Sequence, residues 1–327
     1  MGIPLGGGEP VRRAPSDINV LIGVDKPLGL SSHDAVARVR RQLGVRRVGH
    51  AGTLDPLATG VMVVGVGQAA RLLGMLALDR KRYVARIRWG AETATDDAEG
   101  EPVRTAPVPA AARDAAAARE LLAGFVGPQE QVPPAYSAIS VGGERSYRRA
   151  RAGETVELAA RPIEVHAAEL LALEEGPGEP VWTVAFDVSK GTYIRALARD
   201  IGRAAGGAAH LDGLVRTAAG CVGLSDCLAL DAVAPDSARE RALDPVRALG
   251  LPALELAPSA LEDVRCGRPV RGADVAPRGG AADGAAPVAE GGTVALVRGG
   301  SLCALAVAEG GRYHMKDVFP QPIEGVA

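Results

Sequence analysis

The sequence predicts an α+β fold, because strand-like and helix-like segments follow one another without the regular alternation of a doubly wound parallel sheet. The 327-residue chain is 47% hydrophobic and 23% charged, as in ordinary globular proteins. Short apolar runs rich in valine and isoleucine are typical of strands, and alanine-rich or amphipathic segments between them are typical of helices. A chain of this length can bury one large core and a smaller second domain.

The first elements follow from local signals in the sequence. Residues 19–24 are apolar and predict a strand, followed by a turn rich in proline and glycine. Ser31 or Ser32 can cap the next helix, and Gly44 can end it. Residues 61–66, VMVVGV, form a continuous apolar run that predicts a buried strand.

Later segments show weaker versions of the same signals. They predict strands at 83–89 and 181–188, helices at 110–124 and 192–205, and a last pair of strands at 294–297 and 302–307. Residues 127–152, rich in proline and glycine, predict a mobile surface loop, and residues 276–292 a low-complexity loop. Residues 1–17, rich in glycine, proline and charge, predict a disordered tail. A change in composition near residue 250 separates a main domain at 18–250 from a small β-rich domain at 251–327.

Composition also excludes several classes of protein. No apolar stretch reaches the roughly 18 residues of a membrane span, and the N-terminus lacks the apolar core of a secretory signal. The four cysteines lack CxxC spacing and indicate reduced thiols, so we expect a cytoplasmic protein. There is no Walker-type phosphate loop and no metal-ligand cluster in the sequence, so we expect neither a nucleotide cofactor nor a metal.

The basic residues are unevenly distributed. The net charge is −2, yet arginine-rich patches lie at 37–47, 80–88 and 144–151. Such patches can neutralise phosphates and position an RNA without reading its bases. Any one of them could equally be a solvated helix face or strand edge, but three patches around one candidate site favour RNA.

That candidate site is the turn at 49–60, GHAGTLDPLATG. Pro56 disfavours the helical region for Asp55, and Gly52 and Gly60 allow sharp bends on either side. An acid on a rigid loop beside a buried strand is a common catalytic arrangement. In isolation, Asp55 would more simply accept hydrogen bonds from nearby backbone amides.

Five sequence blocks extend this pattern in order: DKPLGLSSHDAV at 25–36, GHAGTLDPLATG at 49–60, KRYVARIRWGAETATDDAEG at 81–100, VPPAYSAISVGGERSYRRAR at 132–151 and SKGTYIRALARDIG at 189–202. They resemble the bacterial tRNA pseudouridine-55 synthases of the TruB family. The resemblance implies a central, mostly antiparallel sheet and a C-terminal PUA-like domain that binds RNA. It also implies isomerisation of the T-loop uridine of tRNA, with the T-arm stem-loop as partner, no cofactor and no obligate protein partner.

The resemblance also assigns roles to individual residues. It implies that Asp55 is the nucleophile, that Arg195 is its ion-pair partner, and that Tyr83 stacks on the uracil and assists proton transfer. It places three further residues against the substrate: His50, Tyr193 and Leu214. Without the motifs, these residues would be interpreted as a surface salt bridge and ordinary packing. Attack on the sugar, attack on the base and assistance of glycal formation are all open to Asp55.

The resemblance also bears on the residues and loops around Asp55. By the resemblance, Lys26 and Pro27 support the active-site loop, and residues 127–152 fold over bound tRNA. The family commonly has two adjacent arginines where this chain has Val215 before Arg216, which removes one possible RNA or structural contact. The alternative functions are a tRNA-binding or tRNA-folding protein that keeps the synthase fold, and a carboxylate-dependent hydrolase. The hydrolase is disfavoured because no second motif carboxylate stands out in the sequence.

Overall fold

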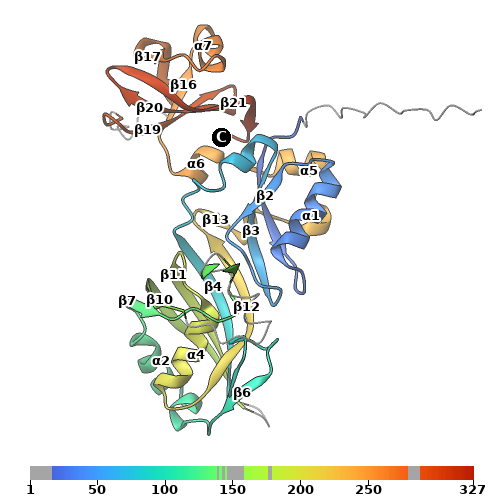
Figure 1. Ribbon diagram of the computed structural model, residues 1–327, viewed down its shortest axis with the longest axis vertical. Coiled ribbons are helices and arrows are strands. Elements are labelled where there is room, and N and C mark those ends of the chain that lie inside the picture. The colour runs from blue at the N-terminus through green and yellow to red at the C-terminus, as the bar shows by residue number, and fades with distance from the viewer. Residues whose placement is uncertain (1–16, 138–139, 142–143, 146–157, 176–178, 279–287) are drawn as a thin grey trace, which may run out of the picture.

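The computed structural model describes residues 17–137, 140–141, 144–145, 158–175, 179–278 and 288–327. The described chain is elongated, with a long sheet and a second, smaller sheet at one end (Figure 1). The long sheet has eleven strands in the order β14-β1-β3-β12-β4-β11-β10-β7, with β2, β13 and β15 attached. Two of its pairs, β1 with β14 and β3 with β12, are parallel, and the others are antiparallel. The α+β class and the mostly antiparallel sheet are therefore confirmed.

The elements of the first part of the chain have the following bounds. The helices are α1 (Ser32–Leu43), α2 (Ala115–Ala123), α4 (Ile194–Ala204), α5 (Pro235–Glu240) and α6 (Pro245–Leu249). The strands of the long sheet are β1 (Leu21–Lys26), β2 (Val48–Ala51), β3 (Ala58–Val66), β4 (Arg80–Trp89), β7 (Gly127–Gln131), β10 (Arg161–Glu174), β11 (Val181–Ser189), β12 (Ala209–Ala219), β13 (Val222–Gly223), β14 (Cys227–Ala229) and β15 (Ala242–Leu243). Two small hairpins are β5 (Ala91–Thr93) with β6 (Pro102–Thr105), and β8 (Ser140–Val141) with β9 (Glu144–Arg145).

Strand β3 is apolar from Gly60 onward because both of its faces are covered. On one face Met62 and Val64 pack with Val36 and Val39 of α1. On the other face Val61 and Val63 join a core shared with the second sheet. A strand buried on both sides needs no alternation of polar and apolar residues, which explains the continuous run in the sequence.

Helix α1 begins and ends where the local signals predict. Ser31 is the N-cap: its hydroxyl accepts a hydrogen bond from the Asp34 amide, and the Asp34 carboxylate accepts one from the Ser31 amide. Gly44 ends the helix in the left-handed conformation, with φ +65°. The two ends therefore follow from residues within one turn of them.

The other half of the long sheet is built on β4, which lies between β11 and β12. From Tyr83 onward its residues alternate between buried and half-buried, with Tyr83, Ala85, Ile87 and Trp89 on the buried face. Helices α2 and α4 flank this half, whereas α1 and α5 flank the half that contains β1 to β3 (Figure 1). The turn that bears Asp55 leads into β3, which pairs with β12, so it lies where the two halves meet.

The second sheet has six strands in the order β17-β21-β20-β19-β16-β18. They are β16 (Ala253–Leu256), β17 (Val270–Arg271), β18 (Val275–Pro277), β19 (Thr293–Arg298), β20 (Ser301–Glu309) and β21 (Arg312–Glu324), with the short helix α7 (Leu261–Arg265) beside them. The β-rich C-terminal region is thus confirmed. Its residues Leu302, Phe319 and Ile323 pack into the core that also contains Val61 and Val63.

Several predicted boundaries were wrong for local reasons. The helix predicted at 110–124 is interrupted at Asp114, which is extended and caps α2 by accepting a hydrogen bond from the Ala117 amide. The helix predicted from residue 192 begins at Ile194, because Tyr193 is extended. The first residues of the predicted mobile loop form strand β7, which pairs with β10.

Parts of three predictions lie outside the described residues. They are most of the tail at 1–17, much of the loop at 127–152, including Arg148, Arg149 and Arg151 of the third basic patch, and most of the loop at 276–292. Within the described residues, no helix is both long enough and apolar enough to cross a membrane.

Candidate active site

The turn that bears Asp55 is fixed by the first residue of α1 and by the loop that precedes it. The Ser32 hydroxyl donates a hydrogen bond to the Leu54 carbonyl at 3.0 Å and accepts one from the Leu54 amide at 2.8 Å. The Gly29 amide donates to the Pro56 carbonyl at 2.9 Å. The backbone on both sides of Asp55 is therefore held, and the carboxylate has a defined position before any substrate binds.

Two buried cations complete this support. Arg216, 1% exposed, donates hydrogen bonds to the carbonyls of Gly52 at 2.9 Å and Val61 at 2.6 Å. Lys26, which is fully buried, donates to the Pro27 and Leu30 carbonyls at 2.9 and 2.6 Å. Burial lowers the pKa of Lys26, while the negative charge of Asp55 opposes that shift. Both cations hold backbone, which agrees with the supporting role expected for Lys26.

Gly60 is required by the close approach of β12 to this turn. Its φ is +100°, and an added Cβ would lie 2.2 Å from the Arg216 carbonyl oxygen. No side chain fits at that distance, since the contact is with backbone.

The structure brings Asp55 and Arg195 together, although 140 residues separate them. The Arg195 Nε atom lies 2.9 Å from Asp55 Oδ2, and Nη2 donates a hydrogen bond to Oδ1 at 3.3 Å. The Arg195 side chain is 6% exposed and that of Asp55 is 38% exposed. The arginine is thus enclosed by protein, while the carboxylate stays open on one side, where a substrate could reach it.

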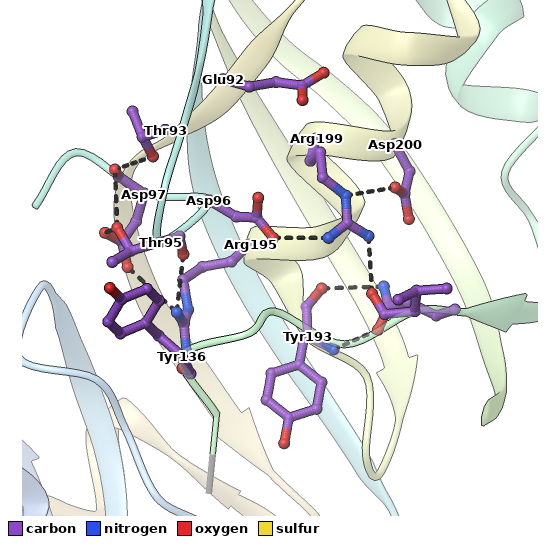
Figure 2. Close-up of polar contacts among 12 residues, drawn as sticks. Glu92, Thr93, Thr95, Asp96, Asp97, Tyr136, Tyr193, Arg195, Arg199 and Asp200 are labelled. Atoms are coloured by element: carbon purple, nitrogen blue, oxygen red, sulfur yellow. Dashed lines mark hydrogen bonds and ion pairs between the residues drawn. The ribbon is translucent and has the colours of Figure 1, made fainter. Parts of the chain in front are cut away.

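The remaining donors of Arg195 are occupied by two other segments, the turn after β5 and the stretch after β7 (Figure 2). Nη1 donates to the Thr95 carbonyl at 2.9 Å and lies 3.6 Å from the Asp97 carboxylate. Nη2 also donates to the Tyr136 carbonyl at 3.0 Å. These contacts orient the planar guanidinium toward Asp55.

Three of the predicted substrate-contacting residues lie around this pair. Tyr83 of β4 and Leu214 of β12 are 7% and 9% exposed and belong to the same core cluster as Leu54 and Ile194, the residues before Asp55 and Arg195. Tyr193 is half-buried at the start of α4. Burial raises the pKa of both tyrosines, and the Asp55 charge adds to each shift, so both phenols are protonated at neutral pH.

His50 lies on β2. It lines a groove of about 420 Å³ together with Leu73, Leu76, Lys81 and Lys190. Its ring is edge-on to that of His33, with 5.7 Å between centroids. Burial lowers the pKa of His50, and the nearby His33 and Arg216 add to that shift, which favours the neutral ring.

The basic patch at 80–88 is largely neutralised within the protein. Arg80 pairs with Asp187 at 2.7 Å, and Arg86 and Arg88 pair with Asp212 at 3.5 and 2.9 Å. Lys81 and Arg82 pair with no acid among the described residues. Burial lowers the pKa of Lys81, and the neighbouring Arg216 adds to the effect. In the patch at 37–47, Arg38 pairs with Asp231, whereas Arg41, Arg46 and Arg47 are exposed.

Several residues of the site were not identified from the sequence. Asp97 is buried beside Arg195, and Arg216 supports the turn, yet neither was assigned a role. The sequence feature that could have indicated Asp97 is the pair of adjacent acids in TATDD at 93–97, shortly before Gly100. The absence of a second carboxylate was therefore not a sound argument against a hydrolase. Asp97 itself is only 4% exposed and is engaged by Arg195 and by Thr95.

Comparisons with known proteins agree with this arrangement. A model of the TruB family pseudouridylate synthase N-terminal domain matches residues 40–194. The protein called tRNA pseudouridine synthase B in Mycobacterium sp. (strain KMS) is 47% identical over 248 residues, which are 76% of this chain and 83% of that protein. The chain belongs to the TruB family of pseudouridylate synthases. It is therefore an isomerase that forms pseudouridine.

Other TruB relatives and solved structures extend the match. The proteins of the same name in Thermobifida fusca (strain YX) and Arthrobacter sp. (strain FB24) are 51% and 43% identical, over 65% and 89% of this chain and 73% and 93% of their own lengths. A chain in an H/ACA RNP bound to a substrate RNA containing 2'-deoxyuridine superimposes with a TM-score of 0.66 at 23% identity, over 97% of this chain and 90% of that one. An archaeal box H/ACA sRNP Nop10-Cbf5 complex gives 0.63 at 22%, over 94% and 88%. These two superpositions show that the fold is shared along nearly the whole chain.

Proposed function

We propose that this protein isomerises the uridine at position 55 of the tRNA T-loop to pseudouridine, with the T-arm stem-loop as its binding partner. The observation that supports this most directly is the ion pair of Asp55 with the enclosed Arg195, at 2.9 Å, on a turn fixed from both sides. The relatives named tRNA pseudouridine synthase B support tRNA as the substrate.

The chemistry begins with a nucleotide outside the RNA stack. An enzyme that acts on a glycosidic bond in folded RNA must unstack the base first. Asp55, held in place by its ion pair with Arg195, then acts as the nucleophile, and a covalent intermediate divides one difficult step into two easier ones. The uracil separates at its glycosidic nitrogen, turns, and rejoins the sugar through a ring carbon; that carbon then loses its proton, and the freed nitrogen gains one. Arg195 orients the carboxylate, since its other donors are held by backbone carbonyls.

The other side chains bind and orient the base. Tyr83 offers a buried ring for stacking, worth roughly 1–3 kcal/mol for one base. Its hydroxyl stays protonated at neutral pH, because burial raises its pKa, so it can donate a proton to the ring nitrogen that the sugar has left. Leu214 and Tyr193 line the same region, and the neutral His50 lines the groove that contains Lys81 and Lys190, where it contacts the RNA loop that the base has left.

We also infer a division of labour along the chain. Residues 18–250 form the catalytic domain, and residues 251–327 form a PUA-like RNA-binding domain. We expect the enzyme to be cytoplasmic, where tRNA is its substrate, and to act without a protein partner.

Asp55→Asn tests this function. The variant keeps the size of the side chain but lacks the nucleophile, so we expect no pseudouridine on a purified T-arm stem-loop, with tRNA affinity close to that of wild type. Arg195 would still be able to donate to the amide oxygen, so the fold should persist. Turnover by Asp55→Asn would refute the role of Asp55.

Measurements on tRNA from cells separate the enzyme from a tRNA-folding protein. If the main activity were RNA folding, tRNA from cells that produce Asp55→Asn would be folded as in wild type, and pseudouridine at position 55 would be unaffected by the loss of the protein. Mapping pseudouridine in tRNA from cells without this protein measures this directly, and an unmodified position 55 is the result we expect.

A further inference from the structure

A second arginine, Arg199, lies one turn after Arg195 on the same face of α4 (Figure 2). It is 8% exposed, and each of its guanidinium nitrogens has an acceptor. Nη1 donates to the Asp96 carboxylate at 2.8 Å, Nη2 to the Val132 carbonyl at 2.8 Å, and Nε to the Asp200 carboxylate at 2.9 Å. A planar guanidinium with three fixed acceptors has little freedom to move.

Arg195 and Arg199 bridge the same two segments. Arg195 contacts the turn at 95–97 through the Thr95 carbonyl, and the stretch at 132–136 through the Tyr136 carbonyl. Arg199 contacts the same turn through Asp96 and the same stretch through Val132. The stretch is therefore fastened to one helix at both of its ends.

Gln131 adds a third attachment next to Val132. Its side chain is 2% exposed and makes a reciprocal pair of hydrogen bonds with the backbone of Tyr193: its amide nitrogen donates to the Tyr193 carbonyl at 3.1 Å, and its oxygen accepts from the Tyr193 amide at 2.9 Å. All three attachments therefore reach the start and the first two turns of α4.

The turn at 95–97 contains locally unfavourable features. Asp96 has φ +59°, and among the described residues it is the one non-glycine residue with a positive φ. Its carboxylate is buried, and burial raises its pKa to about 6 even though Arg199 and Arg195 act in the opposite direction. Strained, desolvated residues of this kind persist where the surrounding structure fixes them, and they cluster at functional sites.

We propose that Arg199 and Asp96 are positioning residues that hold the Arg195 guanidinium against Asp55. Neither contacts Asp55; they act through the carbonyls of Thr95 and Tyr136, on which two Arg195 nitrogens depend. If either carbonyl moves, the plane of the Arg195 guanidinium turns and the carboxylate moves with it. This inference rests on the proposed function, because it assigns the pair to the same reaction.

The central test is the single-turnover rate of Arg199→Met on the T-arm stem-loop, at a temperature where the variant is fully folded. We expect the rate to fall about 10- to 100-fold, the cost of displacing a reacting group by about 1 Å. We expect tRNA affinity to stay at the wild-type value, since both side chains are buried. Arg203→Met is the matched control: Arg203 lies one turn further along α4 and pairs with Glu92, away from Asp55, so its rate should equal that of wild type.

Asp96→Asn and the double variant show whether loss of folding, rather than loss of positioning, explains a lower rate in Arg199→Met. Arg199→Met leaves the Asp96 carboxylate buried without its partner, which is strongly destabilising. Asp96→Asn combined with Arg199→Met removes the buried negative charge, and Arg199→Lys keeps a positive charge at position 199. We expect the two single effects on the rate to be far from additive, because each removes the same interaction.

Hydrogen exchange gives a readout that does not depend on catalysis. We expect faster exchange of the amides at 93–97 and of Val132, Ala135 and Tyr136 in Arg199→Met, and wild-type exchange there in Arg203→Met. A folded Arg199→Met enzyme with the wild-type single-turnover rate would overturn the proposal, as would unchanged exchange of both segments. An inactive wild-type enzyme would instead refute the proposed function, and the exchange result would still show whether the pair positions the two segments.

Discussion

Arg195→Lys separates the charge of Arg195 from its geometry. In the native protein the guanidinium pairs with Asp55 through two nitrogens and donates to two backbone carbonyls, those of Thr95 and Tyr136. A lysine keeps the positive charge but places one ammonium where the arginine has three nitrogens. It can stay with Asp55 or satisfy a carbonyl, but it cannot reproduce the whole set.

The structure sets the size of the effect. Arg195 is 6% exposed, so water does not readily replace a lost donor. Each of these part-buried carbonyls costs about 1–3 kcal/mol when left without a partner, and two of them lower the free energy of unfolding by about 2–6 kcal/mol. In catalysis the carboxylate is no longer oriented, and we expect the single-turnover rate to fall about 100-fold for a displacement of about 1 Å.

Two measurements test the argument together. Quench-flow analysis of pseudouridine formation on a T-arm stem-loop gives the rate, and urea unfolding gives the stability. Arg203→Lys is the control, because it makes the same substitution on the same helix at a side chain that is 55% exposed. If Arg195→Lys kept the wild-type rate, the geometry of the guanidinium would be irrelevant and charge alone would explain its role.

Three further predictions follow from other contacts. Burial would raise the pKa of Glu92, but hydrogen bonds from Arg203 and Arg104 outweigh burial and lower that pKa from 4.5 to about 2. The Glu92 carboxylate should therefore contribute up to about 3 kcal/mol to the free energy of unfolding above pH 4.5, and this contribution is lost as the pH falls toward 2. Urea unfolding against pH should show that loss in wild type and a smaller one in Glu92→Gln; equal profiles would contradict it. Affinity for tRNA should fall steeply with salt, and Lys81→Met should reduce the slope of log affinity against log salt by about 1, whereas an unchanged slope would exclude a phosphate contact at this lysine. Tyr83→Phe should keep tRNA affinity, since the ring remains, but slow product formation, and a wild-type rate would show that the hydroxyl transfers no proton.

Local sequence signals predicted those parts of the fold that depend on neighbouring residues. Ser31 and Gly44 gave the two ends of α1, and the apolar run at 61–66 gave a buried strand. The same approach failed at 110–124, where alanine content favoured one helix but the side chain of Asp114 starts a new one. Composition describes propensity over a window, whereas a cap depends on one side chain and one amide.

The sequence by itself determined the family and the α+β class, and its short motifs singled out Asp55 and Arg195 as candidate residues of the site. Tertiary structure alone decided that Arg195 is shared among Asp55, Asp97 and two carbonyls, and that Arg199 is fastened to the same turn and stretch. These contacts join residues up to 140 positions apart. Burial decides their strength, because a guanidinium without water must find all its acceptors in the protein, and which acceptors it finds depends on how distant segments pack.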